Sequence, residues 1–182
     1  KSILFLGRIS KMKRPELFIE ALNILNMENV DFTACIVGDP LPKDEDYYQQ
    51  LKSMSKEYGL ESKITFEKAV TNSQTAEYYN KFEVYVNSTL SGSFDKTIFE
   101  AMSCEQVVVS SNKSLVGKIQ PDLIFEEGSA KDLALKLKQV LAMSAQDKHA
   151  LGATLRNYVV NDHSLNGLVS KFIKITADEK HS

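Results

Sequence analysis

Tryptophan is absent from the sequence, and cysteine, proline and long apolar runs are scarce. The two cysteines, Cys35 and Cys104, have no histidine or cysteine beside them, which excludes common zinc-ligand and redox-pair spacings and fits a reducing cytoplasm. No apolar run approaches the roughly 18 residues that span a bilayer, and the first residues lack signal-peptide organisation. We therefore expect a cytoplasmic chain with no transmembrane segment; peripheral attachment of a full-length protein to the cytoplasmic membrane face stays open.

An excess of charge of one sign is also missing. The 22 basic side chains nearly balance 24 acidic ones, and a net charge of −2 offers no general attraction for nucleic acid or an anionic membrane. With 182 residues, 43% of them hydrophobic, the chain can bury one large core. We expect a single domain over residues 1–182 and, because a strand begins directly after Lys1, a further folded unit before it.

Short apolar runs alternate with longer segments of helical period, which is typical of parallel strands joined by crossover helices. The predicted fold class is α/β, a Rossmann-like, doubly wound parallel sheet with a helical C-terminal tail. Ligands bind such sheets at the carboxyl ends of the strands, so the segments after the strands form the candidate site. The predicted strands are residues 2–6, 31–37, 63–66, 83–86 and 107–109.

The helices are predicted from start signals and apolar spacing. Pro15 suits a first helical turn, a second helix runs from Asp46 to Tyr58 and ends at Gly59, and a shorter one follows Ser73 up to Lys81. Beyond residue 129 the chain reads as helical throughout. The expected apolar stripes are Phe18, Ala21, Leu22 and Leu25 in the first helix, Ala130, Leu133, Ala134, Leu137 and Leu141 in the tail, and Leu165, Leu168, Val169 and Phe172 after Ser164 as an N-cap.

Two of the segments after strands have a composition suited to ligands. The loop from Gly7 to Arg14 carries four cations directly after the first strand, so it is either an anion site or a solvated basic loop. Residues 66–71, after the third strand, are small and branched enough to line a flat base pocket.

The segment from Ser91 to Glu100 follows the fourth strand and enters a helix through a turn of small residues. Free N–H groups at such a helix start attract phosphate, although Lys96 in the first turn opposes the helix dipole. Alternatively, Asp95 caps the helix and neutralises Lys96. Glu100 is either a ligand for sugar hydroxyls or an ordinary surface glutamate.

Several functional classes are excluded by inspection. The sequence has no G-x-G-x-x-G, Gly117-Lys118 lacks the surroundings of a P-loop, and no G-x-S-x-G nucleophile elbow occurs. The three histidines, at positions 149, 163 and 181, have no acidic or cysteine partner at ligand spacing. We predict neither a metal site nor a histidine-based catalytic group.

The motifs together resemble the C-terminal, donor-binding domain of the GT-B retaining glycosyltransferases, the family also described as glycosyl transferases group 1. The resemblance covers nearly the whole chain. Three positions depart from it: the family's usual glutamate eight residues before Glu100 is Gly92, and Glu105 and Val107 replace a Gly and a Pro. The matching segments are Phe5-Leu6-Gly7-Arg8 with Lys13, Pro15 to Ala21, Ile36-Val37-Gly38-Asp39, Ile64-Thr65-Phe66, Tyr85-Val86-Asn87-Ser88, Phe99-Glu100-Ala101-Met102-Ser103-Cys104 and Val107 to Ser110.

The resemblance implies a role for each matching position. Arg8 and Lys13, on the loop that begins at Gly7, hold the donor diphosphate and are the catalytic residues, because preorganised cations stabilise the charge that develops on it without a metal. Glu100 binds the ribose hydroxyls, and the backbone around Val70 meets the base. The turn that faces the sugar and distal phosphate consists of Ser93, Phe94, Asp95, Lys96 and Thr97.

The implied function is binding of a nucleotide-diphosphate sugar for metal-independent transfer of the sugar, with retention, to an acceptor glycan, lipid or small molecule. The acceptor would be held by an N-terminal domain that this chain does not contain, so we expect the isolated domain to transfer poorly. The alternatives are a non-catalytic nucleotide-sugar-binding or scaffold domain and a nucleotide-sugar epimerase of GT-B architecture. A flavodoxin-like regulatory domain would need an acidic cluster at the strand ends, where Asp39 stands alone.

Overall fold

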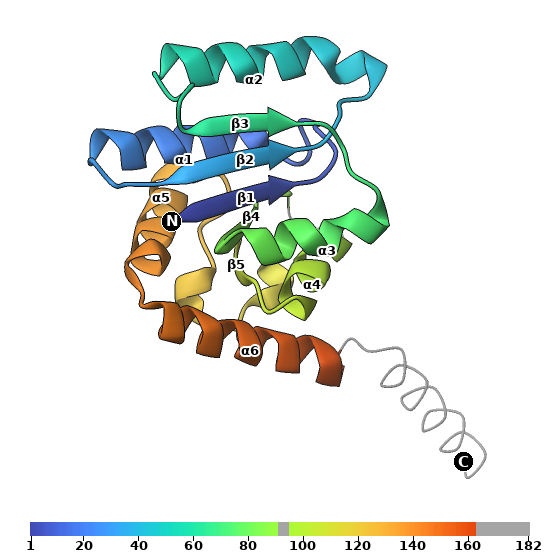
Figure 1. The fold of residues 1–182 in the computed structure, drawn as a ribbon, viewed down its shortest axis with the longest axis vertical. Coiled ribbons are helices and arrows are strands. Elements are labelled where there is room, and N and C mark those ends of the chain that lie inside the picture. The colour runs from blue at the N-terminus through green and yellow to red at the C-terminus, as the bar shows by residue number, and fades with distance from the viewer. Residues whose placement is uncertain (91–94, 163–182) are drawn as a thin grey trace, which may run out of the picture.

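The structure, a computed structural model, describes residues 1–90 and 95–162 and contains one parallel sheet of five strands (Figure 1). The strands lie in the order β3-β2-β1-β4-β5, which confirms the predicted α/β class and doubly wound sheet. All five lie within two residues of the predicted positions. Their bounds are β1 Ser2–Leu6, β2 Thr33–Val37, β3 Ile64–Glu67, β4 Val84–Asn87 and β5 Val107–Ser110.

Helices cover both faces of the sheet. On one face α1 packs between α2 and α5, and on the other α4 packs between α3 and α6 (Figure 1). This division results from right-handed crossovers, because the chain moves outward from β1 to β3 and then returns to β4 beside β1. The helices are α1 Pro15–Met27, α2 Glu45–Glu57, α3 Asn72–Lys81, α4 Lys96–Ser103, α5 Ala130–Ala142 and α6 Ala145–Asp162, with short 3-10 turns at Pro42–Asp44, Lys113–Leu115 and Pro121–Leu123.

The core lies between the sheet and these helices. The strands are apolar on both faces because both are covered, and residues 3–6, 34–37, 84–87 and 107–110 are buried throughout. Both predicted stripes that fall on described residues turn inward. Phe18, Ala21, Leu22, Leu25, Leu133, Ala134, Leu137 and Leu141 are buried, and Ala130 packs against them partly exposed.

The helix ends agree with the sequence in two cases and differ in one. Pro15 occupies the first turn of α1, and Gly59, with φ of 67°, comes directly after the C-cap of α2. The prediction that α3 starts at Ser73 is wrong. The helix begins at Asn72, because the Thr71 side chain and Gln74 form a capping box. The predicted stripe after Ser164 lies outside the described residues.

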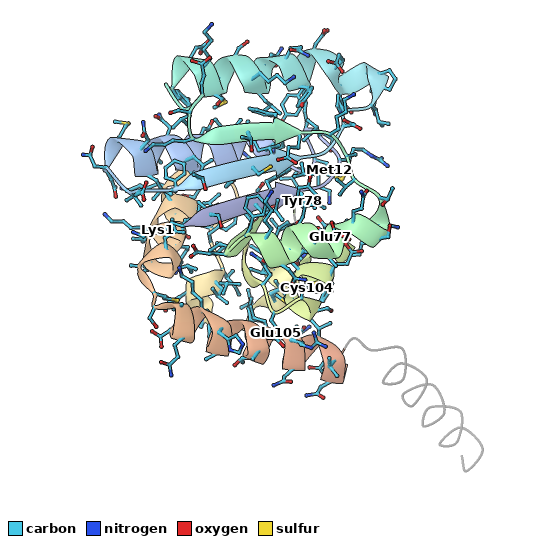
Figure 2. The ribbon with its side chains drawn as sticks, in the orientation of Figure 1. Lys1, Met12, Glu77, Tyr78, Cys104 and Glu105 are labelled. Carbon is cyan, nitrogen blue, oxygen red and sulfur yellow. The ribbon has the colours of Figure 1, made fainter. Side chains whose placement is uncertain are left out.

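Helix α6 rests directly on the turn at the end of α4. An ideal Cβ on Gly152 of α6 would lie 1.9 Å from the backbone oxygen of Glu105, which is labelled in Figure 2. Arg156, one turn further, donates to the carbonyl oxygen of Ser103 at 2.6 Å. The chain therefore has no room for a methyl group at position 152.

Replacing Gly152 with Ala should lower the free energy of unfolding by about 2 kcal/mol, because overpacking forces α6 away from Glu105. A mid-helix Gly→Ala change without a clash would instead stabilise by about 1 kcal/mol. Urea unfolding measures the difference. Ala153→Gly in the same helix turn is the control and should cost about 1 kcal/mol from helix propensity alone. A Gly152→Ala chain as stable as the parent would contradict the packing.

None of the helices in residues 1–90 and 95–162 combines the length and hydropathy required to cross a membrane.

Candidate functional site

A cleft of about 470 Å³ opens at the carboxyl ends of the strands. It lies where the chain order reverses between β1 and β4, the topological switch point at which doubly wound sheets bind ligands. Six residues predicted for the site line it: Gly7, Arg8, Val70, Lys96, Thr97 and Glu100. They come from separated segments that only the fold brings together.

The floor of the cleft is made by two loops in close contact. The Gly7 amide donates to Val37 at 3.0 Å, and the Gly38 amide donates to Glu67 at 3.0 Å, so the loops continue the sheet ladder. An ideal Cβ on Gly38 would lie 1.9 Å from the Gly7 carbonyl oxygen. Because no side chain fits at Gly38, glycine at this position lets the two loops approach each other closely.

The four cations after β1 do not act as one cluster. Arg8 is exposed and lines the cleft, whereas Lys11 is exposed without lining it. Arg14 adopts φ of 52° as the residue before α1 and pairs with Glu16 at 3.4 Å. Lys13 turns inward to Asp95. Two of the four charges are therefore paired within the protein, Arg14 with a neighbouring glutamate and Lys13 with a distant carboxylate, while Arg8 alone of the four lines the cleft.

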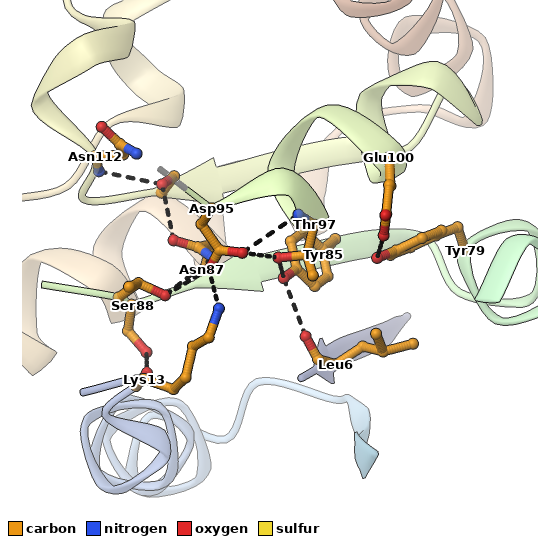
Figure 3. Close-up of polar contacts among 12 residues, drawn as sticks. Leu6, Lys13, Tyr79, Tyr85, Asn87, Ser88, Asp95, Thr97, Glu100 and Asn112 are labelled. Carbon is orange, nitrogen blue, oxygen red and sulfur yellow. Dashed lines mark hydrogen bonds and ion pairs between the residues drawn. The ribbon is translucent and has the colours of Figure 1, made fainter. Parts of the chain in front are cut away.

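Asp95 is the most heavily coordinated side chain near the cleft (Figure 3). It is 4% exposed, and Lys13 binds its carboxylate. Asn87 Nδ2 and Thr89 Oγ1 each donate to Oδ2 at 2.7 Å, while Thr97 donates to Oδ1 from Oγ1 at 2.8 Å and from its amide at 3.3 Å. The hydrogen bond from the Thr97 amide makes Asp95 the N-cap of α4, as one of the two interpretations of this segment predicted.

The charge state of Asp95 is set by these contacts. Burial alone raises the pKa of the carboxyl, but the hydrogen bonds from Lys13, Thr89 and Thr97 and the Lys13 charge outweigh it and lower the pKa to about 2. Asp95 is therefore an anion at neutral pH, fixed at the amino end of α4.

Lys96 has a different partner from the predicted one. Its ammonium lies 3.5 Å from Glu100 Oε1, one helical turn along α4, and is 64% exposed. The expectation that Asp95 neutralises Lys96 is wrong, since Asp95 pairs with Lys13, 82 residues away. Lys96 thus stands at the mouth of the cleft rather than inside the capping contact.

Glu100 is held by a buried aromatic pair. The Tyr79 hydroxyl donates to Glu100 Oε2 at 3.3 Å, and the Tyr79 ring packs edge-on against Tyr85 with centroids 5.5 Å apart. Burial raises the pKa of Tyr79, and the charges of neighbouring groups raise it further, so its hydroxyl remains a donor. Tyr85 donates to Thr97 Oγ1 at 2.7 Å. Glu100 also lines a second hollow of about 490 Å³ between α3, α4 and α6.

The loop after β3 forms one wall of the cleft. Ala69 and Val70 line it, as predicted for residues 66–71. The loop after β2 was missed at the sequence level because it has no charged cluster to mark it. Together with the start of α3, it supplies further wall residues that the sequence did not assign to the site. These are Gly38, Asp39, Pro40 and Leu41 after β2, and Asn72 and Thr75 at the start of α3.

Two predicted residues, Ser93 and Phe94, lie outside the described residues. In the part of the chain that the structure describes, no group of three or more His, Cys, Asp or Glu side chains could hold a metal ion. Cys35 is no nucleophile, because burial raises the pKa of its thiol to about 11.

The sheet order and the polar cleft at its switch point define a Rossmann-like domain of the kind that forms one half of a GT-B fold. Comparison with known families then identifies it further: a model described as glycosyl transferases group 1 matches residues 1–157. The chain belongs to this family.

Relatives and solved structures agree with that assignment. D-inositol 3-phosphate glycosyltransferase of Paenarthrobacter aurescens is 30% identical over 112 residues, 60% of this chain and 27% of the relative, so the match spans about a quarter of that protein. The C-terminal domain of the group 1 family protein LpcC of Francisella tularensis superposes with a TM-score of 0.79 at 22% identity, covering 90% of this chain and 86% of that one. Anabaena HepE, solved with UDP and glucose, gives 0.79 at 19% identity, covering 98% and 48%.

Proposed function

We propose that this chain is the donor-binding half of a glycosyltransferase that holds a nucleotide-diphosphate sugar in the cleft at the switch point. The observation that carries the proposal is the convergence of Arg8, Lys96, Glu100 and Val70 on one cleft in a member of the group 1 family. The cations face the diphosphate, the carboxylate takes the ribose hydroxyls and the loop after β3 meets the base.

Sugar transfer requires stabilisation of the negative charge that develops on the diphosphate. Breaking the sugar–phosphate bond leaves negative charge on the leaving nucleoside diphosphate, which fixed cations and a helix N-terminus stabilise. We propose that this proceeds without a metal and with retention at the sugar. A unit-charge pair at 4 Å is worth about 4 kcal/mol at an effective dielectric of 20, against the ~8–23 kcal/mol that enzymes remove from barriers. Orientation of an acceptor must supply much of the rest.

We further propose that the acceptor, a glycan, lipid or small molecule, is bound by an N-terminal domain of the same protein in the cytoplasm. The cleft for the donor lies at the carboxyl ends of the strands, and the acceptor would approach it from outside. The isolated chain should then bind donor and transfer sugar poorly. Rapid transfer to an acceptor by residues 1–182 alone would contradict this division of labour.

Isothermal titration of the chain with UDP, GDP and ADP tests the donor site directly. We expect one nucleotide to bind, with UDP the first candidate because a structural neighbour was solved with it. Release of a sugar from its nucleotide by the full-length protein then separates a transferase from a binding-only scaffold, and isomerised donor without acceptor would indicate an epimerase.

Arg8→Ala should weaken the binding of that nucleotide about tenfold, or 1.4 kcal/mol, because the side chain lines the cleft as an exposed cation. The weakening should be smaller in high salt, since an exposed charge is screened. Lys11→Ala is the matched control: it removes one cation from the same loop without touching the cleft, and should change affinity less than about twofold. Equal losses in the two variants would show that only net charge matters.

A further inference from the structure

The amino end of α4 already holds an anion of the protein's own. Helix N-termini with free amides attract phosphate, yet here the Asp95 carboxylate accepts from the Thr97 amide and from four side chains, Lys13, Asn87, Thr89 and Thr97. Asp95 is 4% exposed, so these contacts are shielded from water. The carboxylate belongs to the turn that the resemblance expects to face the sugar and distal phosphate.

Lys13 does not line the cleft itself, but its side chain runs beside a residue that does. Its stem passes Gly7, whose ideal Cβ would lie 3.9 Å from Lys13 Cε, and Gly7 lines the cleft. Ser88 fixes the backbone of the loop by donating to the carbonyl oxygen of Lys13 at 2.8 Å. The side chain of Lys13 is 22% exposed and that of Asp95 is 3% exposed, so the ammonium is the outer member of the pair. An entering phosphate would meet Lys13 from the side opposite Asp95.

The pair alters the charge that the cleft offers. Arg8, Lys13 and Lys96 supply three positive charges, and Asp39, Asp95 and Glu100 supply three negative ones, so these groups together carry no net charge. A nucleoside diphosphate brings at least two negative charges. The Asp95 carboxylate therefore offsets part of the attraction that Lys13 would otherwise exert on the diphosphate.

We propose that Asp95 is a resident counter-ion that competes with the donor diphosphate for Lys13 and so limits how tightly the nucleoside diphosphate is held. The inference rests on the proposed function, since it requires a diphosphate in the cleft. Asp95 is then a positioning residue rather than a donor ligand. This competition should speed the release of the nucleoside diphosphate after transfer, because the Lys13 ammonium can return to the Asp95 carboxylate.

Titration of UDP into Lys13→Met, Asp95→Asn and the double variant tests the competition. Asp95→Asn should tighten UDP binding about fivefold, and Lys13→Met should weaken it about tenfold, because each changes the site by one charge in opposite directions. The double variant lacks the ammonium for which Asp95 competes, so it should bind UDP within about threefold of Lys13→Met. It also replaces the buried ion pair with neutral groups, which guards against loss of folding in a single variant.

A matched control is available on the same chain. Glu28 and Lys138 form an exposed ion pair at 2.7 Å, and neither residue lines the cleft. Glu28→Gln removes one negative charge, as Asp95→Asn does, and should change UDP affinity less than about twofold.

The outcomes separate the two proposals. UDP binding to the parent with unchanged or weaker binding in Asp95→Asn would overturn the counter-ion. A double variant that binds as tightly as the parent would overturn it too, because Asp95 would then act through net charge and not through Lys13. Tighter binding in Asp95→Asn, measured as a slower dissociation of UDP by stopped flow, supports it. No binding of UDP, GDP or ADP by either the parent or Asp95→Asn, with both chains folded, would overturn the proposed function and this inference together.

Discussion

Glu100→Ala should weaken UDP binding about 100-fold. Glu100 is held at the wall of the cleft by the Tyr79 hydroxyl and by Lys96, so its carboxylate is oriented before the ligand arrives. A carboxylate that accepts both ribose hydroxyls makes two charge-assisted hydrogen bonds, each worth about 1.5–3 kcal/mol. Titration calorimetry with parent and variant measures the loss.

The ribose contact can be separated from a general change of charge. The parent should prefer UDP over its 2′,3′-dideoxy analogue, and Glu100→Ala should bind the two equally. Glu77→Ala is the matched control, because Glu77 is an exposed glutamate on neighbouring α3 that does not line the cleft (Figure 2). An unchanged preference for UDP in Glu100→Ala would show that another group reads the ribose.

Local sequence rules were sufficient to predict the sheet and most helices. Buried parallel strands are continuous apolar runs, and the helix signals at Pro15 and Gly59 act within one turn, so both can be read without tertiary information. The capping box that starts α3 at Asn72 is equally local. The sequence contained the signal, since Thr71 stands three residues before Gln74, but Ser73 offered a competing cap.

Six of the eight predicted site residues that the structure describes line the cleft, and Lys13 and Asp95 pair beside it, but this pairing could not be predicted from the sequence. Lys13 and Asp95 are 82 residues apart, and the chain reversal between β1 and β4 brings them together. The same reversal brings Asn87 and Thr89, at the carboxyl end of β4, within hydrogen-bond distance of the Asp95 carboxylate. Charge patterns along the sequence indicate which groups are available, and the topology decides which of them neutralise one another.

Lys13→Met should lower the free energy of unfolding at pH 7 by about 3 kcal/mol, because it leaves a buried carboxylate without its cation. The effect should depend on pH. In the parent, the pKa of Asp95 is lowered to about 2, below its value in the unfolded chain, so its contribution is present at neutral pH and is lost as pH falls from about 4 toward 2. That contribution amounts to about 2 kcal/mol.

Without Lys13, the surroundings of Asp95 should raise the pKa of its carboxyl instead of lowering it. Burial is the largest influence on this carboxyl and acts to raise its pKa, so removing the ammonium should move the pKa upward. A carboxyl whose pKa is raised in the folded state costs stability above that pKa, and the cost disappears on protonation. Urea unfolding between pH 7 and pH 4 should therefore show the Lys13→Met deficit shrinking as pH falls.

The Lys13→Met/Asp95→Asn chain, which has no titrating group at this place, should show a deficit that does not change with pH. A constant deficit in the single variant would mean that Lys13 stabilises the fold through the packing of its stem against Gly7 rather than through its charge.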